Sequence, residues 1–265
     1  MRAERAGPGS EPMAGNGCPS SPPRLDRPGR GPYLRAMSDR DRAPPGLLRT
    51  VSLFAELDPA AAAALERVAR RRAYAEGDVI VSEAEPGDAL YVVLSGKVKV
   101  VLYGESGREV ILSIFRAPGD FFGEMSLLDD EPRSATVLAV TPSTLLVLSR
   151  ADFRAHLARH PRVAVQVMTE LSRRLRRADA VIGDLALLDV LGRLAARLRD
   201  LALADGEEAP EGRVLRNRPT QAEIAGMIGA SRETVSRALS ELARRGDVVL
   251  SGRRLLVRHR LLRHP

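Results

Sequence analysis

Two short segments of this sequence carry side chains whose chemistry and spacing suit the binding of a ligand. In the first, Gly123 and Glu124 are followed by Arg133 and Ser134. Glycine permits close approach to its backbone N–H, arginine offers a planar cationic fork for phosphate, serine adds a hydroxyl, and a carboxylate can accept from a sugar hydroxyl. These groups fit a small ligand with a phosphodiester and a ribose. The spacing equally allows a salt bridge between Glu124 and Arg133 that closes a loop.

The second segment spans residues 231–237 and predicts the start of a helix. Arg232, Glu233, Ser236 and Arg237 avoid the apolar face of that helix and project together from its N-terminal half. In a DNA major groove, arginine can bind a guanine edge through two hydrogen bonds, and glutamate can accept from the amino group of cytosine. The alternative is a solvated face with an ion pair between Glu233 and Arg237, four residues apart. The surrounding turn, cap and basic residues favour the DNA interpretation.

The C-terminal part of the chain has a local excess of positive charge. Between residues 213 and 265, twelve arginines stand against four acidic residues, which gives +8 in a chain whose net charge is +7. A GC-rich genome would explain arginine in place of lysine, but not this local excess. Residues 247–257 predict a hairpin with Ser251 and Gly252 at its tip, which places Arg253 and Arg254 for phosphate contacts.

The pattern of apolar residues predicts the helices and strands that position the segment with Glu124 and Arg133. Residues 47–72 predict a helix, with Asp58 and Pro59 as its start signal. Short runs rich in Val, Ile and Leu then alternate with Gly, Pro and Asp turns, which predicts an all-β sandwich or roll. The predicted strands are 79–81, 90–94, 98–102, 110–115 and 145–148.

A helical period returns at Ala151 and persists. Apolar residues then follow one another at spacings of 3, 4, 3, 4 and 3, which is a heptad seam. This pattern favours pairing of two copies of the helix, while a helix that packs on its own β-domain is the alternative. The seam consists of Met168, Leu171, Leu175, Ala178, Ile182 and Leu185.

Residues 185–203 predict a further helix, which an acidic loop at 205–212 ends. Thr220 and Glu223 then form a capping box. Two short helices follow, joined by a turn at 229–231 in which Ser231 can cap the second, so the pattern is a helix-turn-helix. Their inward residues are Ile224, Ala225 and Ile228, and then Val235, Leu239 and Leu242.

Composition narrows the class of protein. The chain has 265 residues, enough for two modest domains, and no run of eighteen uncharged apolar residues, so we expect a cytoplasmic protein without a membrane span. Residues 1–46, rich in Pro, Gly, Ser and Arg, predict disorder, and Met37 is a possible true start. The single cysteine, Cys18, allows no disulfide within the chain. His156 and His160 could meet a metal on a helix, but ordinary surface histidines are the favoured interpretation.

Three separated segments resemble the catabolite activator (CRP/FNR) family. Residues 121–127 and 132–136 resemble the phosphate-binding cassette of cyclic-nucleotide-binding domains, residues 231–237 resemble the family's recognition helix, and residues 173–175 with 185–193 resemble its dimer helix and hinge. The resemblance runs from about Leu47 to Leu262 and implies an α+β protein. Its expected parts are a jelly-roll-like β-roll (47–160), a dimerisation helix and hinge (161–190) and a winged helix-turn-helix (191–265).

The resemblance also assigns roles to residues. Glu124 would bind the ribose hydroxyl, while Gly123, Arg133 and Ser134 would bind the cyclic phosphate. Arg174 and Asp179 on the dimer helix are further expected ligand contacts, and Arg232, Glu233 and Arg237 would read a TGTGA-like half-site. One departure is clear: Ala178 and Asp179 stand where cAMP-responsive members carry a hydroxyl pair that reads adenine.

The expected function is therefore a cyclic-nucleotide-controlled regulator, with cAMP as the first candidate, that binds double-stranded DNA as a homodimer and works with RNA polymerase. It is not expected to be an enzyme or to need a cofactor or metal. A cGMP-like ligand, a dinucleotide or no ligand at all stays open, as do the target genes and activation versus repression. A phosphodiesterase would need a metal or a base and nucleophile, and near the cassette only Asp129, Asp130 and Glu131 join Glu124.

Overall fold

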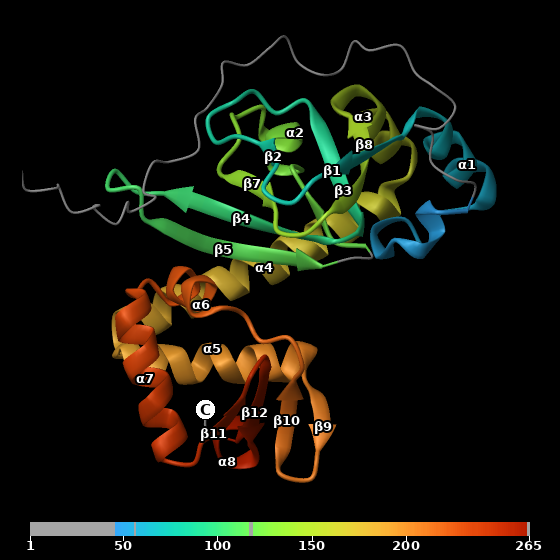
Figure 1. The fold of residues 1–265 in the computed structure, drawn as a ribbon. Helices are drawn as coiled ribbons and strands as arrows, with labels where there is room; N and C mark the ends of the chain where they lie inside the picture. The colour runs from blue at the N-terminus through green and yellow to red at the C-terminus, as the bar shows by residue number, and fades with distance from the viewer. Residues whose placement is uncertain (1–45, 56, 117–118, 264–265) are drawn as a thin grey trace, which may run out of the picture. The chain divides into compact units, whose positions relative to one another are not determined.

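The computed structural model describes residues 46–263, apart from residue 56 and residues 117–118 (Figure 1). The prediction of disorder for residues 1–46 lies outside the described residues except at residue 46, and the predictions that Cys18 forms no disulfide within the chain and that Met37 is a possible start lie wholly outside them.

The N-terminal helical segment is shorter than predicted. Two 3-10 turns, η3 (Leu48–Thr50) and η4 (Ser52–Phe54), precede α1 (Pro59–Val68). Asp58 caps α1, because its side chain accepts from the N–H groups of Ala60 and Ala61, so the predicted start signal is confirmed. The predicted continuation to residue 72 is wrong, because the chain becomes extended at Ala69 and then enters a strand.

The predicted β-roll is present, and in the described residues it consists of eight strands in two four-stranded sheets (Figure 1). The five predicted strands are confirmed within a residue or two at their ends, and β1, β6 and β7 were missed. The order is β1-β8-β3-β6 in one sheet and β2-β7-β4-β5 in the other, and every pairing is antiparallel. The strands are β1 (Arg70–Tyr74), β2 (Val79–Val81), β3 (Ala89–Ser95), β4 (Lys97–Tyr103), β5 (Glu109–Arg116), β6 (Phe121–Phe122), β7 (Thr136–Ala139) and β8 (Ser143–Ser149).

A short helix, α2 (Met125–Asp129), follows β6 and is anchored by arginines of α3 (Arg150–Arg159). Asp130 ends α2 in the left-handed conformation, with φ 63°, and its carboxylate pairs with Arg150 and Arg154. Arg154 also donates to the carbonyl of Leu127 at 2.6 Å. The Asp130 carboxylate is thus a structural anchor for the loop that carries the cassette.

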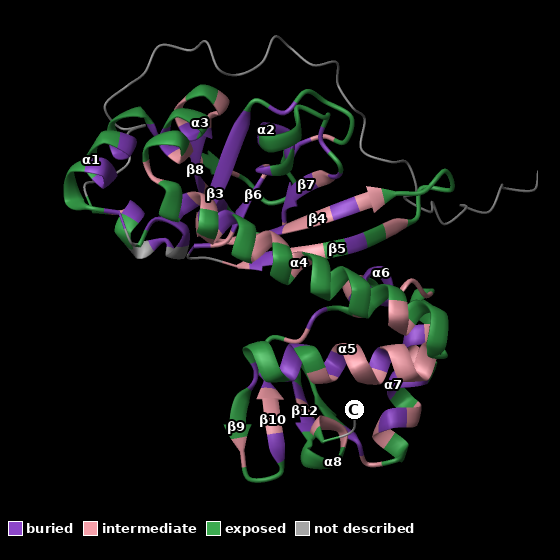
Figure 2. Ribbon diagram, turned by 180° about the vertical axis from the view of Figure 1, so that it is seen from behind, coloured by how far each residue is buried: buried purple, intermediate pink, exposed green. Residues whose placement is uncertain are grey.

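The long helix α4 (Pro161–Leu187) carries the predicted heptad seam, and much of that seam is exposed (Figure 2). Met168, Leu175 and Ile182 are 58%, 64% and 63% exposed. Most of the seam therefore does not pack on the chain's own β-domain. Leu171 is the exception, because it packs against the core of the roll.

The next helix begins five residues later than predicted, as α5 (Val190–Asp205). Leu188 is extended and ends α4, and the Asp189 side chain caps α5 by accepting from the N–H of Gly192 at 2.7 Å. The aspartate gives the new helix its own N-cap, which the continuous apolar pattern had hidden.

The C-terminal segment forms the predicted winged helix-turn-helix. The Thr220–Glu223 capping box is present, Gly229 makes the turn with φ 64°, and Ser231 caps the second helix by accepting from Thr234 N. The predicted acidic loop is wrong, since it folds as a hairpin that joins the wing in one sheet of order β11-β12-β10-β9. The elements are β9 (Glu207–Ala209), β10 (Gly212–Leu215), α6 (Gln221–Ile228), α7 (Arg232–Arg244), β11 (Val248–Ser251), β12 (Arg254–Arg258) and α8 (His259–Leu262).

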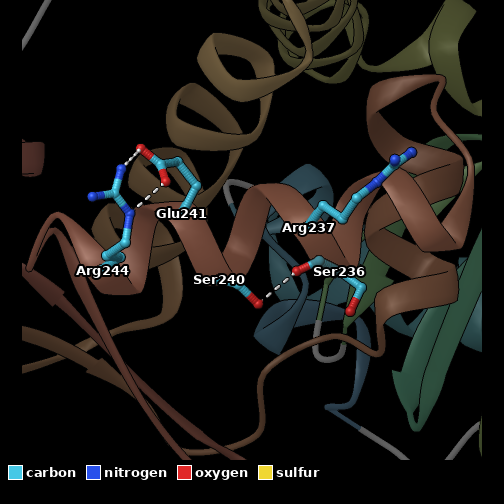
Figure 3. A pocket seen from close by; sticks show the side chains of 5 residues that line it. All are labelled: Ser236, Arg237, Ser240, Glu241 and Arg244. Carbon is cyan, nitrogen blue, oxygen red and sulfur yellow. Dashed lines mark hydrogen bonds and ion pairs between the residues drawn. The ribbon is translucent and has the colours of Figure 1, made fainter.

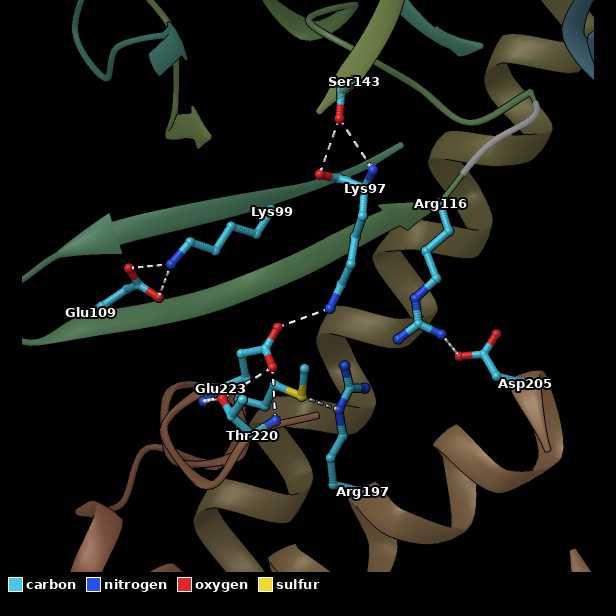
Figure 4. Close-up of polar contacts among 10 residues, drawn as sticks. Lys97, Lys99, Glu109, Arg116, Ser143, Arg197, Asp205, Thr220 and Glu223 are labelled. Carbon is cyan, nitrogen blue, oxygen red and sulfur yellow. Dashed lines mark hydrogen bonds and ion pairs between the residues drawn. The ribbon is translucent and has the colours of Figure 1, made fainter. Parts of the chain in front are cut away.

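Polar contacts connect strands β4 and β5 with residues of the C-terminal helices (Figure 4), and an apolar contact adds to them. Lys97 Nζ donates to Glu223 Oε1 at 2.8 Å, so the carboxylate that caps α6 also binds a lysine of β4. Arg116 pairs with Asp205. A methyl group at Gly226 would lie 3.0 Å from Cγ1 of Ile111, so β5 packs directly on the backbone of α6.

Candidate nucleotide and DNA sites

Arg133 and Gly123 are held against each other in the predicted cassette. Nη1 of Arg133 donates to the carbonyl of Gly123, and Nη2 donates to the carbonyl of Ala89, both at 2.8 Å. Gly123 has φ +86°, and a methyl group there would lie 2.5 Å from Nη1 of Arg133. Only glycine fits this position without strain, and the arginine is 6% exposed. The guanidinium is therefore fixed in place by the backbone before any ligand arrives.

Glu124 pairs with Arg174 of α4. Arg174 Nη1 lies 2.8 Å from Glu124 Oε1, and its guanidinium stacks over the rings of Phe115 and Phe121 at 5.0 and 4.7 Å from their centroids. Among the described residues Glu124 forms no ion pair with Arg133, so the loop-closing salt bridge weighed from the sequence is wrong. The cassette thus connects directly to the helix that carries the heptad seam.

The carboxyl of Glu124 is deeply buried, with 2% exposure, and its Oε2 has no hydrogen-bond partner among the described residues. Burial raises the pKa of Glu124, and the charge of Arg174 opposes that rise. A buried acceptor without a partner is costly. The structure therefore holds an oxygen that a ligand hydroxyl could satisfy.

The other predicted ligand residues are exposed. Ser134 follows Arg133 in the cassette, and its hydroxyl has a weak contact with Met125 Sδ at 3.9 Å. Ala178 and Asp179 follow Arg174 by about one helical turn on α4 and are both exposed. The structure thus brings Gly123, Arg133 and Glu124 together with Arg174, but gives Asp179 no contact to them.

The sequence interpretation missed the aromatic rings of this site. Tyr91 stacks on Phe122, and the guanidinium of Arg133 lies over the Tyr91 ring, 5.7 Å from the ring centroid. Phe115 and Phe121 lie under the guanidinium of Arg174. The chain is only 3% aromatic, and Phe121 and Phe122 stand next to the cassette glycine. That concentration was an available signal for cation–π contacts.

His156 is not the surface histidine that the sequence favoured. It is buried, and its ring contacts Phe54 and His160, whose centroids lie 6.2 and 4.4 Å away. The spacing of two histidines four residues apart does not reveal which of them turns inward, and His160 in fact lies between α3 and α4 rather than in a helix. In the part of the chain that the structure describes, no group of three or more His, Cys, Asp or Glu side chains is arranged to hold a metal ion.

The N-terminal half of α7 presents its polar residues as predicted. Arg232, Glu233 and Arg237 are exposed, and Ser236 is partly exposed. Hydrogen bonds from its own backbone and from Ser231 lower the pKa of Glu233, and the charges of Arg232 and Arg237 add to this. Within the described residues no ion pair joins Glu233 to Arg237, so both side chains are available to a partner.

A shallow concave surface of about 290 Å³ continues along the same helix (Figure 3). Ser240 donates to the carbonyl of Ser236 at 3.0 Å, and Glu241 binds both Arg244 and Arg245. Ser240, Glu241 and Arg244 were missed, although they follow Ser236 and Arg237 at helical spacing. Glu241 partly neutralises the basic end of this face.

The tip of the wing exposes Arg253 and Arg254, as predicted. Arg218 supports the tip through two hydrogen bonds. Its Nε donates to the carbonyl of Gly252 at 3.2 Å, and its backbone N–H donates to the carbonyl of Arg253 at 3.0 Å. The two exposed arginines are thus presented by a hairpin that the preceding loop holds in place. None of the described helices is both long enough and apolar enough to span a membrane.

Comparison with known proteins agrees with this arrangement. Residues 71–160 match the cyclic nucleotide-binding domain, and residues 192–263 match the Crp-like helix-turn-helix domain. The chain is 38% identical over 213 residues to a CRP-like cAMP-activated global transcriptional regulator of Mycobacterium tuberculosis. This match covers 80% of this chain and 94% of the relative. It is 40% identical over 181 residues to the cyclic AMP receptor protein of Thermus thermophilus, covering 68% and 80%.

Among solved structures, the c-di-GMP responsive global regulator CLP of Xanthomonas campestris has a TM-score of 0.66 at 26% identity, and the match covers 76% of this chain and 99% of that one. Both matched domains occur in the order in which the cassette and the recognition helix occur here. With the β-roll, the winged helix-turn-helix and these relatives, the chain belongs to the CRP/FNR family of DNA-binding transcription regulators with a cyclic-nucleotide-binding domain.

Proposed function

We propose that this regulator is a homodimer whose DNA binding is controlled by a cyclic nucleotide, with cAMP as the first candidate. One observation carries the nucleotide part of the proposal: the buried Oε2 of Glu124 has no hydrogen-bond partner among the described residues and lies in the same cassette as the Arg133 fork. These groups suit a ribose hydroxyl and a phosphodiester, respectively. The M. tuberculosis and T. thermophilus relatives are named for cAMP, and the X. campestris neighbour for c-di-GMP.

In this proposal the chain divides as the sequence indicated. Residues 47–160 bind the nucleotide, 161–190 form the dimerisation helix and hinge, 191–265 bind DNA, and 1–46 precede them as an extension. Gly123, Arg133 and Ser134 bind the phosphate, Glu124 binds the ribose, and Arg174 positions Glu124. Asp179 faces the base. The protein acts in the cytoplasm, has RNA polymerase as a partner and catalyses no reaction.

The exposed seam of α4 supports the dimer. Exposed large apolar side chains at heptad spacing are what two paired helices bury. Because α4 also carries Arg174, the dimer contact and the nucleotide contact share one helix. Two recognition helices in such a dimer would meet successive major grooves about 34 Å apart, where Arg232, Glu233 and Arg237 read a palindromic TGTGA-like site.

The deciding experiment is titration calorimetry of the purified protein with cAMP, cGMP and c-di-GMP, together with DNA binding measured with and without each nucleotide. We expect one of them to bind and to raise the affinity for the palindromic site, and the Arg133→Ala variant to lose both effects. If DNA affinity is the same with and without every nucleotide, the regulator is constitutive. Conversion of cAMP to AMP would instead show an enzyme.

Replacement of Ala178 by threonine is expected to raise the affinity for cAMP by about threefold to tenfold, because a restored hydroxyl supplies one hydrogen bond worth about 0.5–1.5 kcal/mol. Calorimetry measures it. Ala178→Val, which has the same shape without the hydroxyl, is the control and should give no gain. An equal gain in both variants would mean that packing, not adenine recognition, is responsible.

Nucleotide affinity is expected to fall as the solution is acidified from neutral pH to about pH 5. Burial raises the pKa of Glu124, so this carboxylate becomes protonated at a higher pH than an exposed glutamate, and it then loses its charge-assisted bonds to Arg174 and to the ribose. The Glu124→Gln variant should bind more weakly but with a flatter pH profile. A fall of the same size in that variant would assign the titration to another group.

Replacement of Arg253 and Arg254 by glutamine is expected to weaken binding to all DNA sequences alike. Two lost phosphate contacts per chain should reduce the slope of log affinity against log salt by about 2 per chain. Fluorescence anisotropy over a salt series, with the specific site and a scrambled duplex, measures both effects. A loss restricted to the specific site would show that the wing reads bases.

A further inference from the structure

A second pocket lies in the described structure away from the cassette, between Leu53, Leu57 and Asp58 on one side and the junction of α3 with α4 on the other. Its volume is about 360 Å³. Leu53, Leu57 and Val163 form apolar parts of its lining, and all three belong to the core of the roll. The pocket therefore has a fixed apolar floor, and it is large enough for a small organic molecule.

The rim of this pocket is cationic. Arg159 and Arg162 line it, are exposed, and form no hydrogen bond or ion pair with any residue that the structure describes. His160 lies between them. The carboxylate among the described lining residues, Asp58, is already bound to the N–H groups of α1, which lower its pKa. The two guanidinium groups are thus available to an anion.

The start of helix α4 adds positive potential at the same junction, and a buried histidine lies beside it. Helix α4 begins here at Pro161 with no side-chain cap, so the positive end of a 27-residue helix faces the junction. Next to His160, the buried ring of His156 has an Nε2 without a hydrogen-bond partner among the described residues. Burial, reinforced by the charges of His160 and Arg159, lowers the pKa of His156 to about 4. The His156 ring is therefore neutral at neutral pH, and the positive charge of the junction comes from Arg159, Arg162 and the start of α4.

We propose that this pocket binds a small organic monoanion with an apolar body, such as an aromatic or short-chain carboxylate, at a site separate from the nucleotide cassette. The apolar body would contact Leu53, Leu57 and Val163, and the carboxylate would pair with Arg159 and Arg162. An inorganic anion would leave the apolar floor uncovered, and a neutral molecule would leave both guanidinium groups unpaired, so each fits only half of the lining.

The proposal is tested by calorimetric titration of the full-length protein with 2-naphthoate and with the neutral 2-naphthalenemethanol. We expect saturable binding of 2-naphthoate, and binding of the alcohol at least about tenfold weaker. The Arg159→Gln/Arg162→Gln variant should bind 2-naphthoate at least about tenfold more weakly, which corresponds to about 1.4 kcal/mol. Both residues are exposed, so the fold should be retained, and thermal denaturation checks this.

Two matched variants make the result specific. Arg173→Gln/Arg177→Gln removes two exposed arginines of α4 that lie outside the pocket lining, and it should keep the parent affinity within about twofold. Arg133→Ala, in the cassette, should also keep 2-naphthoate binding. No binding to the parent, an equal affinity for the Arg159/Arg162 variant, or a loss confined to the Arg133 variant would each overturn the proposal.

Discussion

Replacement of Arg232 and Arg237 together by alanine is expected to reduce the affinity for the specific DNA site by at least about a hundredfold. Each bidentate contact of arginine with guanine is worth about 1–3 kcal/mol of discrimination, and two such contacts are lost in every chain. Both side chains are exposed and unpaired among the described residues, so the variant should fold normally. Fluorescence anisotropy at one fixed salt concentration measures the loss.

The scrambled duplex is the control for this variant, because phosphate contacts do not depend on sequence. We expect its affinity to fall much less than that of the specific site, so that the specificity ratio collapses. An equal loss on both duplexes would make Arg232 and Arg237 phosphate contacts. In that case sequence reading would have to come from Glu233, Ser236 or the face around Ser240 and Arg244.

The C-terminal part was predictable because its signals are local. The capping box of Thr220 and Glu223, the Gly229 turn and the Ser231 cap each depend on residues at most three positions apart, and all three are present. The wing is likewise fixed by Ser251 and Gly252 at its tip. The hairpin at 207–215 was missed, because its acidic residues read as a loop until they pair with arginines such as Arg216.

The N-terminal prediction failed where the structure depends on distant pairing. Arg70–Tyr74 has no apolar alternation of its own and becomes strand β1 because it pairs with β8 (Ser143–Ser149). No residue near Arg70 in the sequence indicates that β8 is its partner strand. At β1 the tertiary context therefore outweighed the local pattern. The break between α4 and α5 was missed for a different reason, because the apolar run at Leu185 is continuous and hid the local cap at Asp189.

In the candidate site, too, the features that depend on nearby residues could be predicted and those that depend on distant residues could not. Gly123, Arg133 and Glu124 could be singled out from residue type and spacing, since they lie in one short segment. The ion pair between Glu124 and Arg174 joins residues 50 positions apart, so spacing could not find it, and the sequence offered Arg133 as the partner instead. The burial of Glu124 also depends on residues that are distant in the sequence, and this burial raises the pKa of the carboxyl.

Replacement of Arg133 by alanine is expected to reduce nucleotide affinity by roughly a hundredfold or more. Two charge-assisted hydrogen bonds to the phosphate, each worth about 1.5–3 kcal/mol, disappear together. The same substitution leaves the carbonyls of Gly123 and Ala89 without their donor, so stability should also fall, by about 1–3 kcal/mol. Calorimetry gives the affinity, and urea denaturation gives the free energy of unfolding.

The two losses must be separated, because a partly unfolded roll would also bind nucleotide poorly. Arg213→Ala is the matched control, since the Arg213 guanidinium likewise donates two hydrogen bonds to a backbone carbonyl, that of Gly206, in the C-terminal segment. It should lower stability while leaving nucleotide affinity within about threefold of the parent, because it touches no cassette residue. If Arg133→Ala keeps its affinity for every nucleotide while losing stability, the Arg133 fork serves only to hold the backbone of the cassette. The phosphate would then have to be bound by the N–H groups and the Ser134 hydroxyl alone.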